Sequence, residues 1–230
     1  MPNIDNNITQ VQRRLQQAAR DAGRNPEDVL LLAVSKTRSS TQLISAIDSG
    51  IKSFGENYLQ EAATKIAELD EHSLDWHFIG PLQSNKTRQV AEQFSWVHTV
   101  DRLKIAQRLS SQRPESMAPL NICLQINIDH EPSKSGFIPE EAAKLAVAIA
   151  QLPMLKLRGL MAIPKARQDI VGQRAAFAKL RKLGEEINSL LDNSQKLDTL
   201  SMGMSGDLEA AIYEGATIVR VGTDIFGPRD

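Results

Sequence analysis

The sequence has no long apolar run and no excess of either charge. Its longest uninterrupted apolar stretches, residues 29–34 and 145–150, hold six residues each, whereas a membrane-spanning helix needs about 20. The 27 Lys and Arg residues balance 28 Asp and Glu residues, and the basic residues form no tract. These absences predict a soluble protein with neither a membrane nor a nucleic-acid partner.

Cysteine is nearly absent, and the histidines are scattered. Because Cys123 is the single cysteine, an intramolecular disulfide is excluded, and its apolar neighbours predict a packed thiol in a cytoplasmic protein. Four histidines lie in four different segments: His72, His77, His98 and His130. They lack the close spacings typical of metal ligands, so we predict no metal.

The N-terminal segment lacks the apolar core of a targeting signal. Its apolar residues recur instead at helical spacing, which predicts a surface helix: Ile4, Ile8, Val11 and Leu15. No internal repeat, low-complexity tract or linker divides the sequence. We therefore expect residues 1–230 to form a single domain.

Eight short segments rich in β-branched or apolar residues alternate with segments of helical periodicity. The predicted strands are residues 29–34, 51–54, 76–79, 96–100, 122–128, 157–163, 199–202 and 217–221. Eight βα units leave about 29 residues each, near the short end for a closed (β/α)8 TIM barrel. An open doubly wound sheet is the alternative. The first strand is not followed by G-x-G-x-x-G, however, and eight uninterrupted units favour closure.

A lysine ends the first predicted strand, in the stretch VLLLAVSK. Counting by twos places Leu32, Val34 and Lys36 on one side, so this lysine can face the barrel interior. Functional groups of such barrels gather at the C-terminal strand ends, and burial favours the neutral, nucleophilic amine. The alternative is a solvated lysine that simply leaves the strand.

The last predicted strand, in GATIVRVGTDIFG, contains an arginine. Alternation places Arg220 on one side and the two valines, Val219 and Val221, on the other. Valines usually face the helix layer, so Arg220 is expected inside the barrel. It needs an acceptor there, because a guanidinium cannot shed its proton to escape burial.

Two loops after the last two strands are rich in small residues with available amides. SMGMSGD follows the seventh strand, and Gly222 and Thr223 follow the eighth. Loops seven and eight commonly bind phosphate in this fold, although serine and glycine are also ordinary turn residues. Together with a strand-end amine and an inward arginine, they indicate pyridoxal 5'-phosphate held as a Schiff base.

Six motifs, in order along nearly the whole chain, resemble those of the pyridoxal phosphate homeostasis proteins: AVSKT, FGENY, HFIGPLQSNK, GLMAIP, SMGMSGD and VRVGTDIFG. The resemblance implies a single barrel like the N-terminal domain of alanine racemase. It implies that Lys36 forms the Schiff base, that Arg220 faces the pyridine nitrogen, and that Ser205, Gly222 and Thr223 surround the phosphate. The full set of cofactor-binding residues that it implies is Lys36, Asn57, Ser201, Met204, Ser205, Arg220, Gly222 and Thr223.

The implied role is to bind and buffer pyridoxal phosphate, with effects on vitamin B6 and amino-acid balance and with cofactor-requiring apoenzymes as recipients. No catalytic residue is predicted. An arginine at the ring nitrogen disfavours its protonation and so weakens the electron sink that carbanion chemistry uses. Racemization also needs acid/base groups on both faces of the substrate, and Lys36 supplies only one. The sequence ends soon after the eighth strand, so we expect no second domain to supply another group, and we expect a monomer.

Other interpretations stay open. A pyridoxal-phosphate-dependent amino-acid racemase of low activity is the main alternative, and a structural protein with the cofactor as a folding ligand is another. GPLQSNKT resembles a phosphate loop, but Asn85 replaces its second glycine, which disfavours nucleotide hydrolysis. The sequence leaves open whether His77, Lys86 and Lys134 belong to the site.

Overall fold

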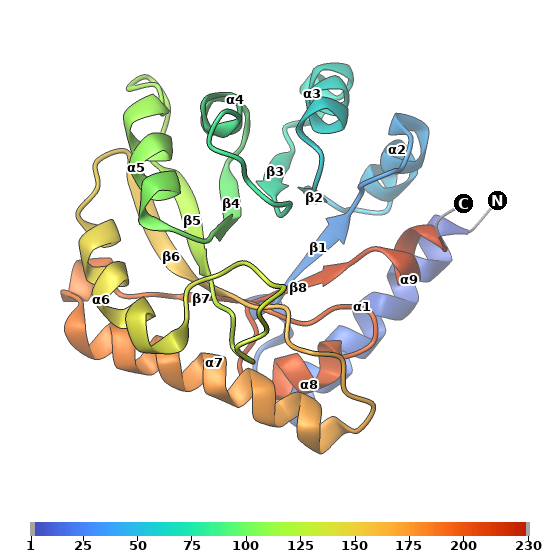
Figure 1. Cartoon of the computed structure of the whole chain (residues 1–230). Coiled ribbons are helices and arrows are strands. Elements are labelled where there is room, and N and C mark those ends of the chain that lie inside the picture. Colours follow the sequence, from blue (N-terminus) through green and yellow to red (C-terminus); the bar gives the residue numbers. More distant parts are fainter. Residues whose placement is uncertain (1–2, 229–230) are drawn as a thin grey trace.

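The computed structural model describes residues 3–228, in which eight strands alternate with helices along the chain (Figure 1). The strands are β1 Leu30–Val34, β2 Ser53–Glu56, β3 Asp75–Phe78, β4 Trp96–Val100, β5 Leu120–Gln125, β6 Leu155–Met161, β7 Thr199–Ser201 and β8 Ile218–Val221. The α-helices are α1 Ile4–Asp21, α2 Ser40–Asp48, α3 Leu59–Glu68, α4 Thr87–Gln93, α5 Leu103–Gln112, α6 Pro139–Ala150, α7 Ile170–Leu190, α8 Leu208–Tyr213 and α9 Thr223–Phe226.

The strands form a closed parallel barrel in the order β1 to β8. Closure occurs between the first and last strands, where Leu30 pairs with Ile218 and Ala33 with Val221. The predicted TIM barrel is therefore confirmed, and the open doubly wound sheet is wrong. Closure leaves no exposed sheet edge and brings the ends of β1 and β8 side by side.

The second strand lies two residues later than predicted, at Ser53–Glu56 instead of 51–54. Ile51 closes the end of α2, because its N–H donates to the Ala46 carbonyl. Glu56 extends the strand although it is a carboxylate, and it is fully buried. Apolar pattern alone missed it, because its burial depends on polar partners from other elements.

The strands bury two faces, as parallel barrel strands do. Leu31, Ala33, Val219 and Val221 face outward and pack in one core with the helix layer. Arg220 lies on the opposite face of its strand, and its side chain is 5% exposed. The prediction of an inward arginine and outward valines is confirmed.

Helix α1 matches the predicted N-terminal helix, and it packs against α8 and α9 (Figure 1). The four apolar residues at helical spacing are all buried in this contact layer. Cys123 is a buried thiol on β5, as predicted. Within residues 3–228, no helix combines the length and apolar character needed to cross a membrane. The same residues contain no group of three or more potential metal ligands.

Candidate functional site

A cavity of about 240 Å³ opens at the C-terminal ends of the strands. It contains seven of the eight residues that the sequence predicted: Lys36, Asn57, Met204, Ser205, Arg220, Gly222 and Thr223. The remaining lining residues are Val34, Arg38, Ile79, Met161, Ile163 and Gly206. Residues from both ends of the sequence meet here because barrel closure places β1 beside β8.

Lys36 follows β1 and is half-buried at the cavity wall. The chain turns sharply immediately after it, because Thr37 has a φ of 63° in the left-handed region. Ser35 precedes it, is fully buried, and donates its N–H to the Gly55 carbonyl on β2. The lysine is therefore carried by a short, tightly bonded segment at a strand end.

A buried ionic cluster lies directly behind this segment. The Lys65 ammonium on α3 donates to the Ser35 carbonyl at 2.7 Å, to Glu56 Oε1 at 2.7 Å and to Glu61 Oε1 at 2.5 Å. The Ser35 hydroxyl also donates to Glu56 Oε1 at 2.6 Å. Burial raises the pKa of Glu56, and the Lys65 charge opposes that rise. We name Ser35, Glu56, Glu61 and Lys65 the Lys65 cluster.

Sequence reasoning missed the Lys65 cluster. The pair Glu61 and Lys65 has the i,i+4 spacing of an ordinary solvent-exposed helix pair. Nothing in that spacing indicates that the Lys65 side chain is only 4% exposed. The one sequence signal for this cluster was Glu56 in FGENY. A carboxylate that is buried at the end of a strand needs hydrogen-bonding or charged partners.

Arg220 forms the floor of the cavity. Its guanidinium Nη1 donates to the Ser201 carbonyl at 2.6 Å and to Ser201 Oγ at 2.7 Å, and Nη2 donates to the Ala162 carbonyl at 3.0 Å. Burial lowers the pKa of Arg220 to about 10, so the group stays charged at neutral pH. The hydrogen-bond acceptors expected for a buried Arg220 are thus two backbone carbonyls and a hydroxyl.

Ser201 lies below the cavity and contacts Arg220 instead of lining the wall. Its hydroxyl is also 2.7 Å from His98 Nδ1, and His98 Nε2 is 2.9 Å from His77 Nδ1. Burial lowers the pKa of His77 to about 3 and that of His98 well below its ordinary value, so both rings are neutral. His77 stacks on Trp96, with ring centroids 5.3 Å apart, as a packed strand histidine.

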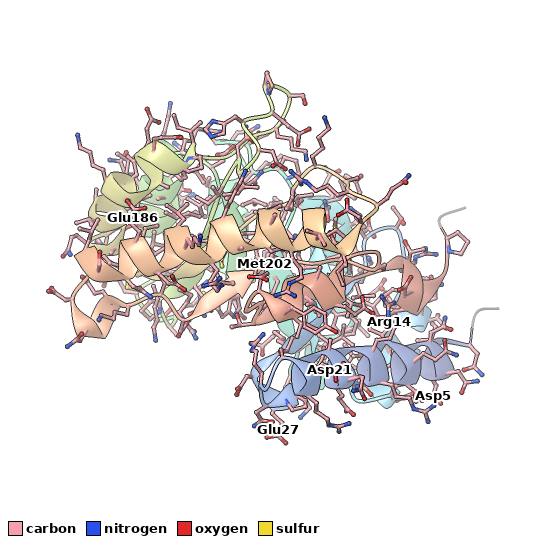
Figure 2. The ribbon with its side chains drawn as sticks, turned by 90° about the horizontal axis from the view of Figure 1, so that it is seen from below. Asp5, Arg14, Asp21, Glu27, Glu186 and Met202 are labelled. Atoms are coloured by element: carbon pink, nitrogen blue, oxygen red, sulfur yellow. The ribbon has the colours of Figure 1, made fainter. Side chains whose placement is uncertain are left out.

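The two segments after β7 and β8 form another part of the cavity wall. Met204 N–H donates to Asp207 Oδ1 at 2.6 Å, which closes the first loop. Arg14 on α1 donates to the Ser205 carbonyl at 2.9 Å and pairs with Glu209 and Asp224. Figure 2 shows Arg14 on α1, which packs beside α8. One guanidinium therefore links the loop after β7 and helices α8 and α9 to the N-terminal helix.

Asn57 contributes an unsatisfied polar atom to the site. Among the residues that the structure describes, its buried Oδ1 has no hydrogen-bond partner. Buried polar atoms are almost always paired, so this oxygen fits a ligand group in the cavity. Its backbone lies so close to Gly80 that a Cβ there would be 2.1 Å from the Asn57 carbonyl oxygen.

The remaining candidates lie around the mouth. Lys86 precedes α4. The hydroxyl of the next residue, Thr87, lies within hydrogen-bond distance of the Ser84 carbonyl and of Gln112 Oε1. This hydroxyl is therefore already engaged, whereas a phosphate loop would need it to bind magnesium. Lys134 pairs with Glu131 at 2.6 Å and lines a neighbouring cavity of about 260 Å³. Neither lysine lines the 240 Å³ cavity in the described part of the chain.

Comparisons with known proteins identify the family of this chain. Residues 3–230 match the family model described as "Alanine racemase, N-terminal domain". The "Pyridoxal phosphate homeostasis protein" of Pseudomonas aeruginosa is 59% identical over 230 residues, which cover 100% of this chain and 97% of that protein. PipY of Synechococcus elongatus PCC7942, solved with PLP bound, is 36% identical with a TM-score of 0.81, over 93% of this chain and 100% of that one.

The barrel is also shared with a more distant protein. Alanine racemase from Corynebacterium glutamicum has a TM-score of 0.71 at 15% identity, over 99% of this chain and 61% of that chain. At that identity the likeness shows the fold alone. The resemblance found in the sequence is confirmed, and the chain belongs to the pyridoxal phosphate homeostasis protein family, whose barrel is that of the alanine racemase N-terminal domain.

Proposed function

We propose that this protein binds pyridoxal 5'-phosphate in the cavity and holds it as a Schiff base on Lys36. The observation that carries the proposal is the convergence of three groups on one cavity: a strand-end lysine, a buried arginine and two loops with available amides. The unpaired Asn57 Oδ1 supports it, because it is a built-in acceptor facing no protein donor within residues 3–228. The relative solved with PLP bound supports the same ligand.

Five of the lining residues have defined tasks in this proposal. The cofactor, when bound, would supply an aldehyde with which a lysine amine can condense with loss of water. Lys36 provides that amine from a rigid strand end, and Ser205, Gly222 and Thr223 provide a hydroxyl and amides for the phosphate. Arg220, whose charge is retained at neutral pH, would present a cation to the ring nitrogen.

The same geometry favours storage over turnover. A positive charge at the ring nitrogen would disfavour protonation of that nitrogen, which carbanion chemistry needs. The two barrel histidines are neutral and buried below Ser201, so they do not supply an acid to the substrate side of the cavity. We infer a monomeric cytoplasmic protein that buffers pyridoxal phosphate for apoenzymes without substantial catalysis, and the low-activity racemase is its competitor.

The first experiment is an absorbance spectrum of the purified protein, followed by borohydride reduction and peptide mass mapping. A pyridoxyl group on Lys36 is expected. Incubation of the loaded protein with L- and D-amino acids then separates the two functions, since the storage role predicts no racemization above the rate of free cofactor. Failure to bind added pyridoxal phosphate, or attachment at another lysine only, would overturn the assignment.

A further inference from the structure

The backbone next to Lys36 is held in a conformation that its residue type disfavours. Thr37 has a φ of 63°, and a β-branched residue in the left-handed region is a genuine outlier. Such a conformation is energetically unfavourable and persists only where the surroundings impose it. The contacts that hold Thr37 in this conformation therefore bear on the position of Lys36, the residue before it.

Those contacts come from the Lys65 cluster. Glu61 Oε1 accepts the Thr37 N–H at 2.6 Å and the Lys65 ammonium at 2.5 Å. The same ammonium holds the Ser35 carbonyl, and Glu56 holds the Ser35 hydroxyl. The residues immediately before and after Lys36 are thus both tied to one buried ammonium, directly on one side and through Glu61 on the other.

Stability alone does not account for this arrangement. The Lys65 and Glu56 side chains are 4% and 0% exposed. The free energy lost by removing two charges from water is about as large as the free energy gained from their attraction, so proteins with apolar replacements are often equally stable. Glu56 Oε2 additionally lacks a hydrogen-bond partner among the described residues. A cluster that brings little stability but contacts both neighbours of the cofactor lysine has a positional role.

We propose that Glu61 and Lys65, together with Glu56, are positioning residues that hold the Lys36 amine where it meets the cofactor aldehyde. This inference rests on the proposed function. Helix α3 supplies Glu61 and Lys65 one turn apart, and β2 supplies Glu56 beside β1. The charged groups of the cluster bind the Ser35 carbonyl and the Thr37 N–H, so they act on the lysine through the backbone on either side of it.

Binding of two ligands distinguishes a misplaced Lys36 amine from general damage to the cavity. Pyridoxal phosphate needs Lys36 to form its Schiff base, whereas pyridoxine phosphate carries an alcohol in place of the aldehyde and needs only the other contacts. Glu61→Leu removes the acceptor of the Thr37 N–H, and Glu61→Gln keeps an oxygen there. We expect Glu61→Leu to weaken pyridoxal phosphate binding about three- to tenfold, to change pyridoxine phosphate binding less than about twofold, and Glu61→Gln to restore most of the loss.

Three controls make the test decisive. In a Lys36→Ala background, Glu61→Leu should cause no further change, since no Schiff base remains to be positioned. Glu185→Leu removes the carboxylate of another i,i+4 pair, with Arg181 at 2.8 Å on α7, and should leave both ligands unaffected. Lys65→Met provides a second disruption of the cluster if Glu61→Leu expresses poorly, and it should show the same selectivity between the ligands.

The outcomes distinguish the two proposals. Equal weakening of both ligands by Glu61→Leu, or no weakening of either, would refute the positioning role while leaving cofactor binding intact. A wild-type protein that forms no reducible adduct at Lys36 would refute the proposed function itself, and the positioning role with it. Selective loss of pyridoxal phosphate, with rescue by Glu61→Gln, would establish the positioning role.

Discussion

Gly80→Ala introduces a single methyl group between the ends of two strands. The new Cβ would lie 2.1 Å from the Asn57 carbonyl oxygen and 2.6 Å from its Cα. These are backbone atoms, so no side-chain rotation relieves the overlap, and the loop after β2 must move. Overpacking in a tight interior costs about 1–3 kcal/mol, and contact with backbone places this case near about 3 kcal/mol.

That cost has two measurable consequences. For a chain of this size, about 3 kcal/mol corresponds to a melting temperature lower by roughly 6–12 °C. The displaced Asn57 also lines the cavity, so cofactor affinity should fall in the same variant. Thermal unfolding of the cofactor-depleted protein, followed by titration with pyridoxal phosphate, measures both effects separately.

Gly184→Ala is the matched control. It lies inside α7, and its nearest neighbour to a new Cβ is Leu200 Cδ2 at 3.7 Å, which is ordinary contact. Alanine is the better helix former by about 1 kcal/mol, so this variant should melt slightly higher than wild type. If Gly80→Ala melts within about 2 °C of wild type and binds cofactor equally well, the close approach of Asn57 does not constrain the site.

Three further predictions concern Arg220, Ser205 and His77. Arg220→Gln should weaken pyridoxal phosphate binding at least about tenfold and change its absorbance, because a charged hydrogen-bonded group is lost; identical titrations would count against a ring contact. Ser205→Ala should speed cofactor loss on dialysis by about fivefold through one lost hydrogen bond, and unchanged retention would remove it from the phosphate site. Burial lowers the pKa of His77 to about 3 in the folded protein. Between about pH 6.5 and that value, His77 is protonated in the unfolded chain and neutral in the folded chain, so the free energy of unfolding should fall as the pH drops. His77→Gln should reduce this slope by about 1.4 kcal/mol per pH unit near pH 5 in urea unfolding, and an unaltered slope would contradict a neutral buried ring.

The sequence alone determined the barrel and most of the candidate site. Alternation along β8 separated Arg220 from its flanking valines, because successive side chains of a strand point to opposite faces. Strand-helix alternation predicted the closed parallel sheet, and closure then implied that Lys36 and Thr223 would meet. These conclusions follow from local periodicity and from a general property of the fold.

Only the tertiary structure decided which polar residues support the site from behind. The resemblance implied that Ser201 binds the cofactor, but within the described residues Ser201 does not line the cavity, and its hydroxyl accepts from the Arg220 guanidinium. Glu56 and Lys65 are nine residues apart, and their pairing depends on how α3 folds back over β2. No local pattern reports this contact, because the free energy of a buried charge is set by partners that arrive from other elements.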